Sequence, residues 1–199
     1  TATDGYVCVN PGACTDGTFA ATGKCDPKLT SATVVPDSLV KSASGAATAT
    51  FTTTTAIPVD GTIIVTFPAG FNVASATVTA GTGQGGAAGG FSIAKNNQVV
   101  TVTRDGNGGI WTAGVTTIDF GVVVNPSSAG ATDPFTITTT DGSNNNLDTN
   151  TDVAAVTITD AVCTVPTISI GAATWGGALC ASGATNVASG TTCTITATD

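Results

Sequence analysis

The chain contains no histidine, no methionine and no glutamate, so every one of its 13 acidic residues is an aspartate. Charged residues make up only 9% of the 199 residues, and aromatic residues only 5%. Without histidine or glutamate, acid–base catalysis would need a pair of aspartates. The sequence marks neither a neighbouring pair nor a nucleophile motif such as G-x-S-x-G. The composition therefore predicts a protein that is not an enzyme.

Positive charge is equally scarce in this chain, whose net charge is −8. The cations are Lys24, Lys28, Lys41, Lys95 and Arg104. Nucleic-acid binding needs clustered Lys and Arg, so we exclude nucleic acid as a partner. No run approaches the roughly 18 apolar residues of a membrane helix, and no signal peptide begins at the first residue. We expect no membrane span, in a chain that is either mature or a piece of something longer.

Cysteines occur only near the two ends of the chain. They are Cys8, Cys14, Cys25, Cys163, Cys180 and Cys193. In a Thr-rich, Lys-poor chain they indicate disulfides and an oxidising setting, so we expect an extracellular or cell-surface location. The absence of C-x-x-C and of histidine argues against a zinc site, and spacing alone leaves the disulfide connectivity open.

Between the cysteines, apolar residues alternate with threonines, which is the period-two pattern of half-buried strands. The pattern is clearest in 46–55 and 62–67, where Pro58 and Asp60-Gly61 supply turn residues, so these runs should pair as an antiparallel hairpin. Further strand-like runs cover 32–35, 74–80, 91–94, 98–104, 115–124, 134–140 and 153–159. Short strands at this spacing predict an all-β sandwich of the immunoglobulin-like kind.

Three segments follow from this pattern. We expect a Cys-rich segment at 1–30, an immunoglobulin-like antiparallel β-sandwich at 31–160 and a second Cys-rich segment at 161–199. The two end segments have too few apolar residues for a core and would need disulfide staples. Each bridge would contribute about 2–4 kcal/mol to such a module.

The two Cys-rich segments read as halves of one module when the end of the chain is joined to its beginning. The joined sequence contains a Cys followed closely by Pro at Cys163, G-T-x-C ending at Cys193, the pair Gly5-Tyr6, C-x-D-G-T-F from Cys14 and Cys-x-Pro at Cys25. It resembles a Sushi, or complement control protein, module over about a third of the chain. The resemblance implies the disulfides Cys14–Cys163 and Cys25–Cys193, which leaves Cys8–Cys180 as an extra pair.

The chain begins and ends with the same tetrapeptide, TATD, at residues 1–4 and 196–199. Such self-similarity fits one unit of a tandem array, or separate subunits that join head to tail; a chance match is the third reading. We therefore expect a structural building block of an extracellular filament or surface appendage, whose partners are copies of itself. The alternative is an adhesin-type module that binds glycans or another surface protein.

The polar stretch from residue 141 to 152 has oxygen-bearing side chains at the spacing of a calcium loop. The candidate ligands are Asp141, Ser143, Asn145, Asp148 and Asp152. Strand-like flanks and the lack of a closing glutamate favour the alternative, a polar hairpin loop with Asx turns. We expect no other cofactor. The match to G-x-G-x-x-G within Gly81–Gly90 precedes a strand-like run, so we expect a sandwich loop there.

Two remaining features concern packing and surface. Trp111 and Trp175 are interpreted as core or interface residues, with an exposed sugar platform as the alternative. Thr48, Thr50, Thr52 and Thr54 should lie on an outer strand face, where threonine fits well. O-glycosylation of these hydroxyls is a further hypothesis, because it would keep so neutral a protein soluble.

Overall fold

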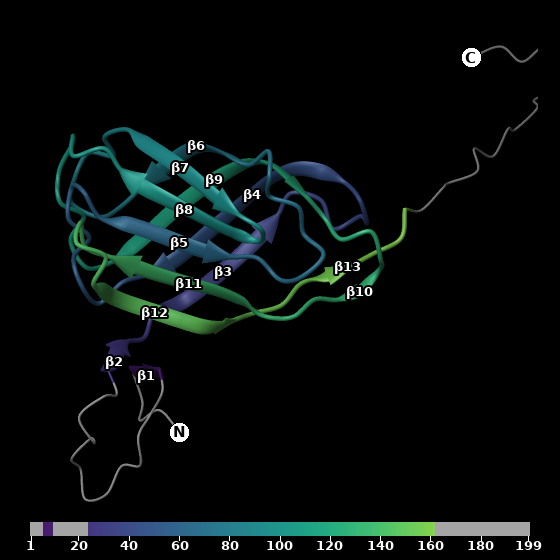
Figure 1. Cartoon of the computed structure of the whole chain (residues 1–199), viewed down its shortest axis with the longest axis horizontal. Coiled ribbons are helices and arrows are strands. Elements are labelled where there is room, and N and C mark those ends of the chain that lie inside the picture. The colour runs from purple at the N-terminus through teal and green to yellow at the C-terminus, as the bar shows by residue number, and fades with distance from the viewer. Residues whose placement is uncertain (1–5, 10–23, 162–199) are drawn as a thin grey trace, which may run out of the picture. The chain divides into compact units, whose positions relative to one another are not determined.

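The computed structural model describes residues 6–9 and 24–161, which form a sandwich of two antiparallel sheets (Figure 1). One sheet has the strand order β3 (Thr30–Pro36), β4 (Ser44–Thr52), β9 (Val115–Val124), β6 (Thr77–Thr82). The other has the order β12 (Asn146–Val153), β11 (Phe135–Thr140), β5 (Thr62–Thr66), β8 (Val99–Arg104), β7 (Phe91–Asn96). The predicted all-β sandwich is confirmed.

Two short strand pairs accompany the sheets. β1 (Tyr6–Val9) pairs with β2 (Lys24–Pro27), and β10 (Gly130–Ala131) pairs with β13 (Thr157–Ile158). The described part of the chain has no helix long and apolar enough to cross a membrane.

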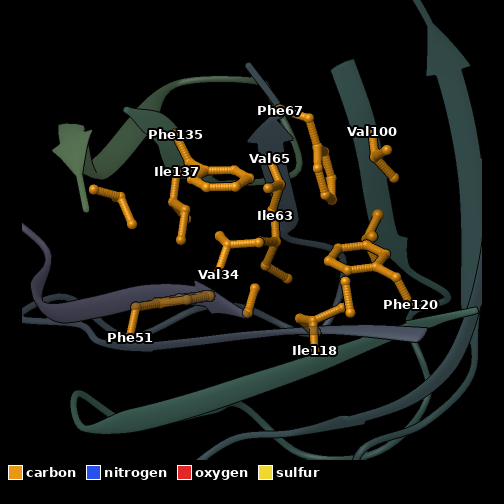
Figure 2. Close-up of a cluster of buried hydrophobic side chains, with 14 of the residues drawn as sticks. Val34, Phe51, Ile63, Val65, Phe67, Val100, Ile118, Phe120, Phe135 and Ile137 are labelled. Atoms are coloured by element: carbon orange, nitrogen blue, oxygen red, sulfur yellow. The ribbon is translucent and has the colours of Figure 1, made fainter. Parts of the chain in front are cut away.

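The core fills the space between the two sheets (Figure 2). On β4 the buried Ala47, Ala49 and Phe51 alternate with threonines, and on β5 of the opposite sheet the buried Ile63 and Val65 alternate with the half-buried Ile64 and Thr66. Alternation works because successive side chains of a strand point to opposite faces. Each large apolar side chain buried in this way contributes about 1.5–3 kcal/mol, so the core supplies most of the stability.

Phenylalanines hold the centre of this core. The ring of Phe67, just after β5, has its centroid 5.6 Å from Phe71, 5.9 Å from Phe120 and 5.6 Å from Phe135. The contacts with Phe120 on β9 and Phe135 on β11 are edge-on, a favoured geometry for aromatic pairs. One aromatic cluster therefore ties both sheets together.

The predicted hairpin between 46–55 and 62–67 is wrong. β4 pairs with β3 and β9, whereas β5 pairs with β11 and β8, so the two strands lie in different sheets. Their connection crosses from one sheet to the other instead of turning tightly, and Ile57 within it exchanges two backbone hydrogen bonds with Trp111. Pro58 and Gly61 do form a turn, with the Gly61 N–H donating to the Pro58 carbonyl at 3.0 Å. That turn only redirects the chain into β5.

The prediction for the stretch after β11 is also wrong in part. Only residues 141–145 form a turn, and the chain then runs as β12 from Asn146. The expected strand at 153–159 is reduced to the two residues of β13. β12 escaped the sequence pattern because three consecutive residues, Asp148, Thr149 and Asn150, are polar and all buried. Their polarity masks the alternation.

Trp111 is confirmed as a packing residue, since its side chain is fully buried. Its indole covers the glycine-rich stretch, where a Cβ added at Gly83 would lie 2.1 Å from Trp111 Cδ2. A short bridge joins Gly83 to Gly86, so this stretch is a close-packed backbone segment beside the tryptophan. Trp175 lies outside the described residues.

Candidate assembly site at the two ends of the sandwich

Residues 26–29, which precede β3, contact the beginning of β12. Asn146 Nδ2 donates to Asp26 Oδ2 at 2.8 Å, and the Leu29 N–H donates to the Thr149 carbonyl at 3.1 Å. The buried Asn150 Nδ2 donates to the Leu29 carbonyl at 3.0 Å, and the Leu29 side chain is fully buried in the core. We call this contact the Asn146 end of the sandwich.

A second contact lies where the described chain leaves the sandwich. The Thr159 N–H donates to the Leu39 carbonyl at 2.7 Å, and the Lys41 N–H donates to the Thr159 carbonyl at 2.8 Å. Lys41 Nζ also pairs with Asp160 at 2.6 Å. Both of these side chains are well exposed, so the ion pair adds little. Asn125 Nδ2 donates to two carbonyls of 38–40 and fixes that segment in place. We call this contact the Thr159 end.

The two contacts lie at opposite ends of the sandwich. β12 starts at the first contact and is 8 residues long, which corresponds to about 26 Å, before the chain continues to Thr159. Parallel bridges join Lys28 to Thr149 and Val40 to Thr159, so 28–40 and 149–159 run in the same direction and meet at both of these points. The first and last segments of the sandwich therefore lead away from opposite ends (Figure 1).

The outward face of the four-stranded sheet is dominated by threonine. The ladder registers align Thr33, Thr50, Thr117 and Thr82 across all of its strands. One row further, the Thr48 hydroxyl donates to Asp119 Oδ1 at 2.7 Å. The prediction that Thr48, Thr50 and Thr52 lie on the face away from the core is confirmed, because they alternate with buried residues. Thr54 lies beyond the end of β4 and is exposed.

The five candidate calcium ligands are divided between the turn and β12. Asp141 caps the turn: its Oδ1 accepts from the N–H groups of Ser143 and Asn145, and its Oδ2 from Asn145 Nδ2. These are the Asx-type hydrogen bonds of the polar-loop alternative. Asp152 is exposed further along β12. Among the described residues no group of three or more Asp, Glu, His or Cys could hold a metal ion, and the calcium site stays a prediction.

Asp148, the fourth of these residues, is turned into the protein. Its carboxylate is fully buried and accepts hydrogen bonds from the Thr54 N–H at 3.2 Å, the Thr55 N–H at 3.0 Å and the Thr54 hydroxyl. The donors belong to the segment that follows β4, so Asp148 links the two sheets. A buried carboxylate needs such donors to be tolerated.

A buried arginine, which the sequence did not single out, organises the other loops at this end. Arg104 stacks on Trp111 and donates from Nη1 to the carbonyls of Ile57 at 3.2 Å and Pro58 at 2.7 Å. Burial lowers the pKa of Arg104, and the carboxylates of Asp105 and Asp60 offset part of that effect. Arginine keeps its proton nevertheless, so the Arg104 side chain stays positively charged and holds these loop carbonyls in place.

One surface pocket bears on the glycan alternative. It has a volume of 510 Å³ and is lined by Phe71, Asn72, Ala74, Lys95, Asn97 and Gln98. The amide side chains could donate to and accept from sugar hydroxyls, although Lys95 Nζ donates to the Ala76 carbonyl at 3.0 Å.

The cysteine predictions fall largely outside the described residues, which include only Cys8 and Cys25. These two are direct partners in the β1–β2 ladder. Cys14, Cys163, Cys180 and Cys193 lie outside the described ranges. The proposed disulfides therefore remain predictions.

Comparisons with known proteins give a distant likeness to a solved structure. No family model matches the chain, and no curated protein matches it. Among solved structures it is similar to BslA, described as a bacterial hydrophobin, with a TM-score of 0.38 and 17% sequence identity. The likeness covers 65% of this chain and 96% of BslA. So distant a likeness carries neither residue roles nor a function to this chain.

Proposed function

We propose that this chain is a non-enzymatic structural building block of an extracellular filament or surface appendage. The observation that carries the proposal is the position of the two contacts at the Asn146 and Thr159 ends. When the chain enters the sandwich at one end and leaves it at the other, such units can be repeated along a line without the chain folding back on itself. Repetition of this kind, head to tail, is a heterologous arrangement that extends into a fibre.

The Cys-rich segments 1–30 and 161–199 are the proposed junction. In this proposal they combine, between repeats or between subunits, into one Sushi-like module beside the immunoglobulin-like sandwich of 31–160. Disulfides would then lock the junction, with Cys14–Cys163, Cys25–Cys193 and Cys8–Cys180 as the pairs implied by the resemblance. The oxidising location that the cysteines indicate supports this arrangement.

The test is the mass of the native material with and without reductant, together with a search for a peptide that contains TITATDGYVC. A large mass that survives reduction, with that peptide present, means covalent tandem repeats. Collapse to 19.2 kDa only on reduction means subunits joined by disulfides. A monomer under both conditions contradicts the proposal.

A peptide map without reduction decides the cysteine pairing in the same material. The resemblance predicts a Cys25–Cys193 link. The β1–β2 register offers Cys8–Cys25 instead, because directly opposed residues of an antiparallel pair have Cα atoms about 4.5–5.5 Å apart, within the range of a disulfide. The second result would remove the Sushi-like pairing while leaving end-to-end assembly open.

A second candidate function is an adhesin-type module that binds glycans, and the pocket beside Lys95 favours it. Titration of the full chain with neutral and uronic-acid oligosaccharides, followed by NMR shifts of the Asn72, Asn97 and Gln98 side-chain amides, tests this function. Saturable shifts at these amides support it, and shifts elsewhere or none contradict it.

A further inference from the structure

We propose that the parallel segments 26–41 and 146–160 form a clamp that bears force along the sandwich. This inference deepens the proposed function, on which it rests only for the source of the load. The clamp consists of the two contacts described above, one at the Asn146 end and one at the Thr159 end. It assigns the load-bearing role to particular backbone hydrogen bonds instead of to the sheets as a whole.

The direction of the two segments determines how force reaches them. Tension between neighbouring units would draw the chain before Leu29 outward at the Asn146 end and the chain after Thr159 outward at the opposite end. Because the two segments run in the same direction, this tension slides one along the other. The backbone hydrogen bonds at the two contacts run from one segment to the other, so sliding strains all of them together. Pulling both segments from the same end would break them one after another.

Several features of the described residues reinforce the clamp against sliding. At the Asn146 end, the Leu29 side chain is fully buried and would have to leave the core before its segment could move. Its carbonyl is also held by the side-chain amide of Asn150. At the Thr159 end, the Thr159 N–H donates to the Leu39 carbonyl and the Thr159 carbonyl accepts from the Lys41 N–H, so two backbone hydrogen bonds hold this residue.

Bonds of β3 add to the same resistance. β3 follows Leu29 directly and forms an antiparallel ladder with β4 from Thr33 to Pro36. Tension along β3 slides it past β4 as well, so the segment is loaded lengthwise against both of its neighbours. The arrangement therefore resists lengthwise tension at both contacts and along the strand that connects them.

Single-molecule pulling on the full chain in two geometries tests the clamp. An azide-bearing residue replaces the exposed Lys28 as the first handle, and a second replaces either Ala161 or Ser143, both exposed. Handles at 28 and 161 make the segments slide. Handles at 28 and 143 peel them apart, because the turn at 143 leads into β12 at the Asn146 end. We expect the sliding geometry to need about twofold more force at equal loading rate, because sliding loads both contacts at once and peeling loads them one after the other. Forced unfolding is governed by the unfolding rate, so the force reports which contacts resist.

A backbone substitution locates the effect. Thr159→Pro removes the N–H that donates to Leu39, and it should lower the sliding force while leaving the peeling force unchanged, because peeling begins at Leu29. Ala155→Pro, in the exposed link between β12 and β13, is the matched control and should change neither force. The comparison of the two geometries in the otherwise unsubstituted chain needs neither proline variant to fold.

The outcomes separate the clamp from the proposed function. Equal forces in the two geometries overturn the clamp, even if the native material proves to be a disulfide-linked array. A higher sliding force that Thr159→Pro reduces supports the clamp, even in a chain whose native mass is that of a monomer. A higher sliding force that Thr159→Pro leaves unchanged overturns the assignment to the Thr159 contact.

Discussion

Arg104 lies over the ring of Trp111, with the guanidinium carbon 4.2 Å from the ring centroid, and both side chains are buried. The two residues come from β8 and from the loop before β9, and they meet beside the connection that carries the chain from one sheet to the other. Cation–π contact is worth more when water is excluded, as it is here. This pair therefore fixes loops that have no regular ladder of their own.

Arg104→Met should lower the free energy of unfolding by about 2–4 kcal/mol, because the carbonyls of Ile57 and Pro58 lose a buried donor. Urea denaturation monitored by Trp fluorescence measures the change. Lys28→Met, which also removes one positive charge but at an exposed position, should stay within about 0.5 kcal/mol. Similar losses in the two variants would mean that net charge matters and the buried contacts do not.

Asp148→Ala should destabilise the protein by about 1–3 kcal/mol, since the N–H groups of Thr54 and Thr55 lose their acceptor. The loss should be the same with excess calcium and with a chelator. Thermal unfolding of the parent chain and of Asp148→Ala under both conditions measures this. If calcium raises the melting temperature of the parent only, Asp148 is an ion ligand and not a buried acceptor for the N–H groups of Thr54 and Thr55.

Gly83→Ala should cost about 1–3 kcal/mol of stability, because the new methyl group would overlap the Trp111 indole and force it to move. A shifted Trp emission spectrum should accompany the loss. Gly45→Ala is the control: its added Cβ would meet only Asp37 Cβ, at 3.9 Å. Equal effects of the two substitutions would contradict the close packing of the glycine stretch against the tryptophan.

We expect the stability of the protein to depend on pH in the acidic range through Asp105. Hydrogen bonds from the side chain and backbone N–H of Asn107 lower the pKa of Asp105 in the folded protein. A lowered pKa contributes stability above the unfolded value of about 4, and that contribution is lost as the pH falls through the folded pKa. Asp105→Asn should therefore weaken the fall in urea midpoint below about pH 4.

Asn107→Ala complements that measurement. It removes the side-chain donor but keeps the backbone one, so it should weaken the acid dependence less than Asp105→Asn does. If both variants lose stability toward low pH as steeply as the parent chain, the Asn107 hydrogen bonds do not stabilise the carboxylate form.

The sequence by itself determined the strands of the two sheets except β12, and it determined which side chains of β4 and β5 face the core. Alternation around Phe51 and Ile63 placed both side chains in the core, and the run 115–124 coincides with β9, because side-chain direction along a strand depends only on local geometry. The scarcity of charge and the Thr-rich outer positions could likewise be predicted without a structure. The turn residues after Pro58 were also recognised correctly as a turn.

Only the tertiary structure decided which strands pair and where polar residues go. β4 and β5 each present an apolar face. Two such strands can pair in one sheet or face each other from two sheets, and the pairing of β4 with β9 and of β5 with β11 places them in different sheets. Asp148 and Arg104 are buried because donors and acceptors far away in sequence surround them. A buried polar group depends on partners that only folding brings together, so its position, and with it the clamp of 26–41 against 146–160, has no local signal in the chain.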